Sequence, residues 1–287
     1  MKLADLLVYV DQTDGAAARL RLASDLARRH GCKLIALYVR ECTPAQLRRR
    51  GIAELGLVSS RQVARLDQDI EASISGAEER LKSLLEVLQR EGGFQAEWRA
   101  VDGSASNVVS QHARCVDLCI VGRDHPGDES SVADTFTEKL LFVTGRPVLF
   151  IPAGIPLETL GRRIVVAWNS SPAATRALND ALPLFERAEK ATILTINLEE
   201  FIAEHGALPI EQMVAHLKRH DLSVDVIQLQ NVGADSFADT LQAKACALGA
   251  DLLVVGAFGP PRFWQDIVGG VTRDMLSRMR LPILMSH

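Results

Sequence analysis

The sequence predicts an α/β fold of two tandem domains, each built on a doubly wound parallel sheet. The length of 287 residues allows one large domain or two, because single cores usually stop growing by about 250 to 300 residues. Three apolar segments recur in the same order, which favours two copies. Within each copy, near-continuous apolar runs alternate with helical patterns, as in parallel sheets that helices cover on both faces.

The repeat rests on three pairs of matching segments. In each pair, a short apolar run in the first copy has a counterpart in the second. Both members of the first pair end in a small polar side chain and lead into a helical pattern. The pairs are 6–11 with 164–169, 116–122 with 250–256, and 146–151 with 281–286.

The two copies differ in length. Asp11 lies 158 positions before its counterpart Asn169. Gly122 lies only 134 positions before Gly256, so the first copy carries 24 additional residues between these anchors. We place them within Glu41–Glu91, where apolar residues at helical spacing predict a long amphipathic helix. The apolar residues of that helix are Ile70, Ile74, Ala77, Leu81, Leu84, Leu85 and Leu88.

The predicted first domain spans residues 1–153 and the second spans 162–287. Residues 154–161 are the predicted linker, because prolines and glycines punctuate the chain there. The strands after Pro147 and Pro282 are expected at sheet edges, where they pair or pack against each other about a pseudo-two-fold axis. One chain then imitates a homodimer of single-domain proteins, so we expect a monomer with an internal pseudo-dimer or a homodimer.

The first helix of the second copy is marked by its end signals. Ser171 is a suitable N-cap residue, and Pro172 suits the first helical position. Pro183 is expected to limit the helix, because proline lacks the N–H group that continues it. The buried stripe is formed by Ala174, Ala177, Leu178, Ala181 and Leu182.

The composition excludes several classes of partner. The chain has 32 Lys and Arg against 36 Asp and Glu, and only 5% of its residues are aromatic. It therefore lacks the positive field and the stacking surfaces of a nucleic-acid binder. Its apolar runs are shorter than the roughly 20 residues of a membrane-spanning helix, so no membrane partner is expected. Five scattered cysteines without a CxxC pair, together with the absence of a secretory pattern, indicate a cytoplasmic protein.

A glycine pattern follows the apolar run that ends at Val255. Gly256, Gly259, Gly269 and Gly270 have the spacing G-x2-G-x9-G-G, and the last pair opens the final helix. Glycine lets backbone N–H groups approach an oxyanion, and a helix N-terminus adds a partial positive charge. Taken alone, the spacing is compatible with a phosphate site and with a tight turn in equal measure.

The surrounding segments resemble the universal stress protein family in its tandem form, through 165–171, 250–256 and 256–273. The resemblance covers the whole chain and is closer in the second copy. It implies Rossmann-like domains of the adenine nucleotide alpha hydrolase-like type, a cytoplasmic role in stress response, and ATP or a related adenine nucleotide as ligand of the second domain alone. By position, it implies a phosphate loop of Gly256, Gly259, Gly269 and Gly270, an adenine contact at Ile196 and a polar contact at Asn169.

Two positions depart from the family pattern. Asn169 stands where the family has an aspartate, which keeps hydrogen-bonding capacity and loses the charge that holds a ribose or assists Mg²⁺. The involvement of Mg²⁺ is therefore left open. Gly270 stands where serine or threonine is usual, so it offers a backbone N–H and no hydroxyl.

The first copy shows the inverse pattern. It retains Asp11 after its first strand and Val39 in its second, but its loop carries Asp124, Asp128 and Glu129. These carboxylates place negative charge where phosphates would lie. We therefore predict that the first domain does not bind ATP in the usual way.

The remaining motifs favour no chemistry. His125 beside Asp124 is better explained as part of a solvated acidic loop than as a metal site. Phe263 and Trp264 in the glycine loop cap a ligand or pack on their own domain, two alternatives of equal weight.

There is no GxSxG elbow and no Walker A lysine, so the protein is expected to be no enzyme, or at most a slow ATPase. Two functions are compatible with the sequence, a nucleotide-responsive regulator with unknown protein partners and a nucleotide-independent interaction protein whose glycines are structural.

Overall fold

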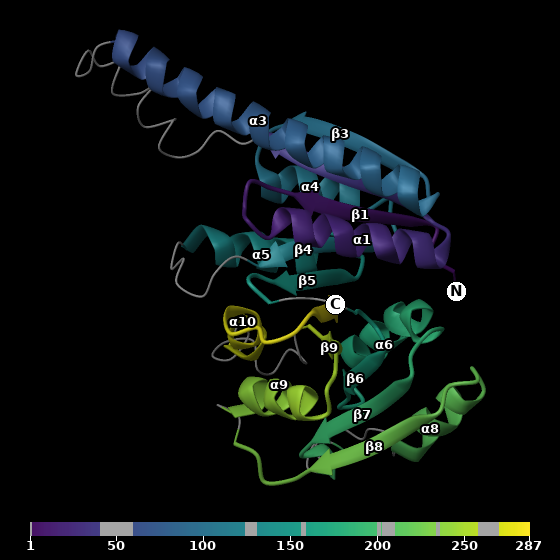
Figure 1. Ribbon diagram of the computed structural model, residues 1–287. Helices are drawn as coiled ribbons and strands as arrows, with labels where there is room; N and C mark the ends of the chain where they lie inside the picture. Colours follow the sequence, from purple (N-terminus) through teal and green to yellow (C-terminus); the bar gives the residue numbers. More distant parts are fainter. Residues whose placement is uncertain are drawn as a thin grey trace.

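The computed structural model of the chain has two halves whose helices and strands follow the same order (Figure 1). The first half contains β1 (Asp5–Val10), α1 (Ala16–His30), β2 (Lys33–Arg40), α3 (Ser60–Gly92), β3 (Ala96–Asp102), α4 (Ala105–Ala113), β4 (Leu118–Arg123), α5 (Ser131–Val143) and β5 (Val148–Pro152). The second half contains β6 (Arg163–Ala167), α6 (Pro172–Phe185), β7 (Lys190–Ile196), α8 (Ile210–Lys218), β8 (Val224–Leu229), α9 (Phe237–Ala247), β9 (Leu252–Gly256), α10 (Gly270–Ser277) and β10 (Ile283–Ser286). The structure describes residues 2–40, 60–123, 131–155, 159–199, 202, 210–233, 236–257 and 270–287, and of 60–74, 131–135, 138 and 270 it describes the backbone alone.

One sheet runs through both halves in the order β3-β2-β1-β4-β5-β10-β9-β6-β7-β8. Within each half the neighbouring strands are parallel, and the two halves meet where β5 pairs with β10 antiparallel. Read outward from that pair, the strand order of one half repeats that of the other. The predicted fold class, two doubly wound domains related by a pseudo-two-fold axis, is thus confirmed.

The junction between the halves is made of buried apolar residues. Ile283 pairs with Phe150 and Met285 pairs with Val148, and all four side chains are almost completely buried. The strands after Pro147 and Pro282 therefore pair directly, as the sequence predicted. Because backbone hydrogen bonds join β5 to β10, neither strand is an open edge and the sheet continues through the junction.

Two helical layers cover the sheet. The core on one face includes residues of α1, α3, α6 and α8, and the core on the other face includes residues of α4, α5, α9 and α10. Successive strand residues alternate between them, since Leu6 belongs to the first core and Leu7 to the second. Each core contains residues from both halves, so the hydrophobic burial that stabilises one half also stabilises the other.

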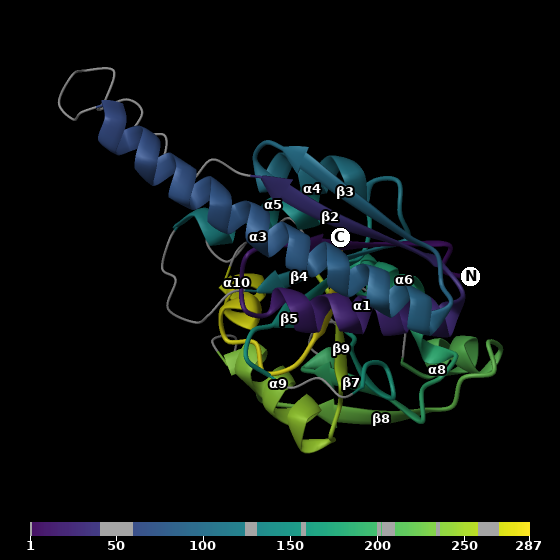
Figure 2. The ribbon, with the colours of Figure 1, turned by 45° about the horizontal axis from the view of Figure 1, so that its top comes forward.

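Helix α3 accounts for much of the additional length of the first copy. It has 33 residues, about 50 Å at 1.5 Å per residue, whereas α8 at the corresponding place has nine. Its C-terminal part packs on α1 through buried Leu85 and partly buried Leu81, Leu84 and Leu88. Its N-terminal part extends beyond the sheet (Figures 1 and 2). Neither α3 nor another helix in the described residues combines the length and apolar character needed to cross a membrane.

Helix α6 begins as predicted and ends later than predicted. Ser171 caps it, because its Oγ accepts a hydrogen bond of 3.1 Å from the Ala174 N–H, and Pro172 occupies the first turn. Pro183 does not limit the helix, which continues to Phe185. Proline costs one intrahelical hydrogen bond, and the burial of Leu184 and Phe185 on the core offsets that loss.

The edge strand β3 is tied to β2 by an ion cluster around Glu97. The Lys33 ammonium and the Arg99 guanidinium both donate hydrogen bonds to the Glu97 carboxylate. These donors, Arg99 foremost, lower the pKa of Glu97 to about 2. The carboxylate therefore remains charged in the folded protein at a pH where an unfolded chain is already protonated.

We expect the stabilising effect of Glu97 to depend on pH. Because the folded pKa lies below the unfolded value of about 4.3, the effect is complete above pH 4.3 and is lost as the pH falls toward 2. Urea denaturation of wild type and Glu97→Gln should show a difference in unfolding free energy that shrinks across this window. Glu79→Gln, on the exposed side of α3, controls for the loss of one carboxylate. A Glu97→Gln difference that stays constant from pH 7 to 2 would contradict this account.

Candidate functional site

The predicted site residues of the second half gather at the carboxyl edge of the sheet. Asn169 follows β6, Ile196 ends β7 and Gly256 ends β9. Strand β6 lies between β7 and β9, so these three residues are on neighbouring strand ends. Gly270 begins α10, which connects β9 to the parallel strand β10, so the helix starts at the same edge. This is the edge at which doubly wound sheets bind ligands.

The oxygen of the Asn169 carboxamide is hydrogen-bonded within the protein. Its Oδ1 accepts a 3.2 Å hydrogen bond from the Ser171 N–H, which shapes the turn into α6. Ser170 within this turn has φ 62°, a left-handed conformation that non-glycine residues seldom adopt. No described residue bonds to the Nδ2 group of Asn169. Its two N–H donors are therefore available to a hydroxyl or carbonyl oxygen at this edge.

Gly256 is required by packing. A Cβ at this position would lie 2.4 Å from the Ala174 nitrogen and 2.8 Å from the Ala173 oxygen, both atoms of the α6 backbone. Such distances are shorter than van der Waals contact, so only glycine lets the end of β9 meet the start of α6 in this arrangement. Gly256 therefore has a structural role that does not depend on a phosphate.

Asn197 was not expected from the sequence. It follows Ile196 with φ 48°, and its carboxamide is bonded at both ends to the Val232 backbone. The Nδ2–O distance is 2.9 Å and the N–Oδ1 distance is 3.2 Å. These bonds join the ends of β7 and β8 and hold one side of the site. An asparagine directly after a predicted strand is a signal that, with hindsight, points to such a turn.

The equivalent edge of the first half carries an ion pair that the sequence analysis missed. Arg19, in α1, is 3% exposed, and its Nη2 lies 2.6 Å from Oδ2 of Asp11. Its Nε donates a 2.9 Å hydrogen bond to the Tyr9 carbonyl. Arg19 shares the buried face of α1 with Ala16 and Ala23, so an arginine within an apolar stripe was the available signal.

Several predicted residues lie outside the described part of the chain. Among them are Gly259 and Gly269 of the second-domain loop. The same holds for the acidic residues of the first-domain loop and for the loop aromatics. These are Asp124, His125, Asp128, Glu129, Phe263 and Trp264.

Comparison with protein-family models identifies the family. The model described as the universal stress protein family matches residues 4–129. Residues 4–129 therefore form a universal stress protein domain. The match lies in the first copy, although the second copy was expected to be the closer one. No relative among curated proteins matches the sequence.

Solved structures share the fold of this chain over its whole length. A universal stress protein from Archaeoglobus fulgidus DSM 4304 is 17% identical with a TM-score of 0.70, covering 98% of this chain and 97% of its own. A putative universal stress protein from Pseudomonas aeruginosa UCBPP-PA14 is 14% identical with a TM-score of 0.56, covering 99% and 93%. A functionally unknown protein from Pseudomonas aeruginosa PAO1 is 15% identical with a TM-score of 0.54, covering 99% and 92%. At these identities the likeness shows a common tandem fold.

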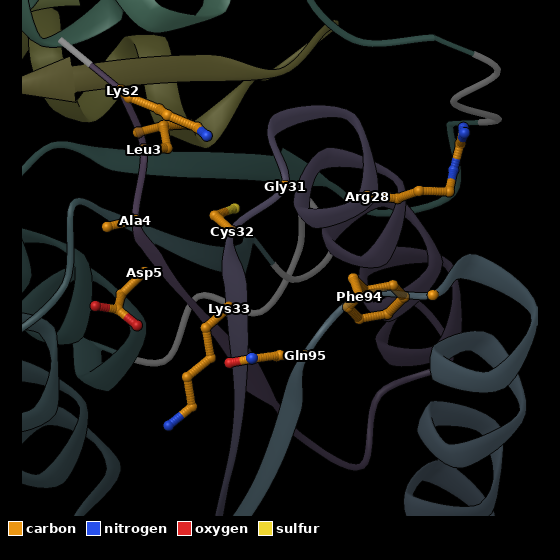
Figure 3. Close-up of a pocket in the computed structure, with 11 residues that line it drawn as sticks. Lys2, Leu3, Ala4, Asp5, Arg28, Gly31, Cys32, Lys33, Phe94 and Gln95 are labelled. Carbon is orange, nitrogen blue, oxygen red and sulfur yellow. The ribbon is translucent and has the colours of Figure 1, made fainter.

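A cavity of about 610 Å³ lies at the opposite edge of the universal stress protein domain, at the amino ends of β1, β2 and β3 (Figure 3). Two of its charged side chains are already paired, because Lys33 binds Glu97 and Arg28 binds Asp25 at 2.6 Å. Burial raises the pKa of the Cys32 thiol to about 11, so at neutral pH it is protonated and a poor nucleophile. We assign no ligand to this cavity.

We expect Gly256→Ala to destabilise the protein by about 1–3 kcal/mol, because the new methyl group forces β9 and α6 apart. Gly76→Ala is the matched control. It lies inside α3, where a Cβ would meet only the end of the Arg80 side chain at 3.8 Å, and replacing a mid-helix glycine stabilises by up to about 1 kcal/mol. Chemical denaturation of both variants measures the difference. Equal stability of Gly256→Ala and wild type would show that the α6 contact is not tight.

Proposed function

We propose that this universal stress protein binds ATP or a related adenine nucleotide at the carboxyl edge of its second domain. Bound nucleotide would alter its choice of protein partners in a cytoplasmic stress response. The observation that supports this most is the meeting of three suitable groups at one edge. They are the Nδ2 of Asn169, to which no described residue bonds, the half-buried apolar side chain of Ile196 and the N-terminus of α10.

Each group suits a different part of an adenine nucleotide. The Asn169 carboxamide can donate to a ribose hydroxyl, and Ile196 offers an apolar wall to the adenine ring. The backbone N–H groups at Gly270 and at the start of α10 suit phosphate oxygens, because a helix N-terminus carries unpaired donors and partial positive charge. Gly259 and Gly269 would complete the phosphate loop. Since Asn169 brings no negative charge, a role for Mg²⁺ is left open.

The proposed role is binding and signalling. The glycine run contains no Walker A lysine. Among the described residues there is no group of three or more His, Cys, Asp or Glu side chains that could hold a metal ion. Any hydrolysis of ATP would accordingly be slow and incidental to switching between bound states.

The loop glycines provide the first test. We expect purified wild type, once denatured, to release an adenine nucleotide that mass spectrometry identifies, or to bind added ATP when purified empty. Gly259→Val and Gly269→Val should lose this nucleotide, because a branched side chain keeps phosphate from the backbone donors. Gly76→Val, within α3 and far from the loop in the chain, is the control and should keep it.

Two results would count against the proposal. If wild type releases no adenine nucleotide and does not bind added ATP, the protein works without nucleotide. If both loop variants retain nucleotide as well as wild type does, the nucleotide binds elsewhere.

The Asn169 side chain provides a second test. We expect Asn169→Ala to weaken ATP binding two- to tenfold, the effect of losing one hydrogen bond worth about 0.5–1.5 kcal/mol. Asn169→Asp keeps an acceptor and adds charge, so it should bind ATP at least as well as wild type if Mg²⁺ participates, and more weakly if it does not. Asn179→Ala, on the exposed face of α6, is the control for calorimetric titration. An unchanged affinity in Asn169→Ala would remove Asn169 from the site.

A nucleotide-independent interaction protein is the second candidate, and one observation favours it. Gly256 is explained completely by its contact with α6, so the first glycine of the motif does not require a phosphate. In this alternative the continuous sheet presents a surface to partner proteins and the glycines serve the turn. The nucleotide-release experiment separates the two candidates.

A further inference from the structure

Arg19 lies where the first domain would receive a ligand. It approaches the carboxyl edge from α1, contacting Tyr9 at the end of β1, Asp11 just beyond it and Gly122 in β4. The equivalent edge of the second domain holds Asn169 and Gly256. A guanidinium that is 3% exposed cannot exchange its protein partners for water without rearrangement.

The guanidinium separates two pieces of backbone. A Cβ on Gly122 would lie 1.9 Å from Arg19 Nη1, and a Cβ on Gly15 would lie 3.9 Å from the same atom. Arg19 is thus wedged between the start of α1 and the end of β4. In the second domain the corresponding residues are Ala173 and Gly256, whose backbones meet with nothing between them.

The second domain cannot form the same wedge. The offset of 158 positions that relates Asp11 to Asn169 relates Arg19 to Ala177. Both members of the ion pair therefore have uncharged counterparts. At this place the first domain is neutral because Asp11 and Arg19 carry opposite charges. The second domain is neutral because Asn169 and Ala177 carry none.

Both oxygens of the Asp11 carboxylate accept hydrogen bonds. Oδ2 binds Arg19, and Oδ1 accepts hydrogen bonds from the N–H and the hydroxyl of Thr13. The carboxylate is mostly buried, with 15% of the side chain exposed. A ribose hydroxyl approaching Asp11 would have to compete with a charged, fixed and buried donor.

We propose that Arg19 occupies the Asp11 carboxylate, the polar contact of the first domain's ligand site, so that the domain is closed to nucleosides by its own side chain. The location of this site rests on the equivalence with the proposed second-domain site. Without Arg19, the ligand class that fits is a nucleoside, because Oδ2 of Asp11 could then accept a hydrogen bond from a ribose hydroxyl.

The test is equilibrium dialysis of the full chain with labelled adenosine. We expect Arg19→Ala to take up one more equivalent of adenosine than wild type, with first-domain affinity raised at least tenfold. Asp11→Asn with Arg19→Ala should gain the same equivalent, since it reproduces Asn169 and Ala177 and leaves no unpaired buried charge that would threaten folding. Arg21→Ala, at an exposed position of the same helix, is the control and should take up no more than wild type.

The test compares the equivalents of adenosine that each variant binds with those that wild type binds. Binding of one equivalent by wild type and two by the variants supports both this proposal and the second-domain site. No binding of adenosine by wild type and one equivalent by the variants supports this proposal, and the proposed function is then decided separately by the nucleotide-release experiment. If the double variant has the far-UV circular dichroism of wild type but no added adenosine, or if wild type already binds two equivalents, Arg19 does not close the site.

Discussion

The antiparallel pairing of β5 with β10 is the contact on which the rest of the architecture depends. Each strand would otherwise be an edge with a row of unpaired N–H and C=O groups and a buried apolar side chain on either face. Joined, they turn two five-stranded sheets into one, and both hydrophobic cores continue across the junction. The carboxyl edges of the two halves are placed by this single pairing, since every other strand is ordered outward from it.

Much of this architecture follows from patterns within the sequence. Matching segments in the same order indicate two copies, and prolines directly before β5 and β10 mark the strands that meet. Pro183 shows the limit of local rules, because the helix continues past it wherever buried neighbours such as Phe185 compensate for the lost hydrogen bond.

The site was less accessible to sequence reasoning, for a physical reason. Glycine spacing suggested a phosphate loop, but the contact of Gly256 with the α6 backbone is a relation between distant segments that no spacing reveals. Arg19 was missed because its meaning depends on Asp11, Tyr9 and Gly122 together, and an arginine on a helix is ordinarily a surface residue. Residue type and spacing therefore located the edge, whereas three-dimensional contacts separated its structural residues from those available to a ligand.

The covalent connection between β5 and β6 has a consequence for how the two sites can differ. The ten residues 153–162 join the halves, which therefore have a high effective concentration for each other, so their pairing does not depend on how much protein is present. In an assembly of two identical chains, every substitution appears in both sites at once. Here a substitution enters one half and leaves the other as it was, which allows one half to keep the ion pair of Asp11 and Arg19 while the other carries the uncharged Asn169 and Ala177 at the same positions.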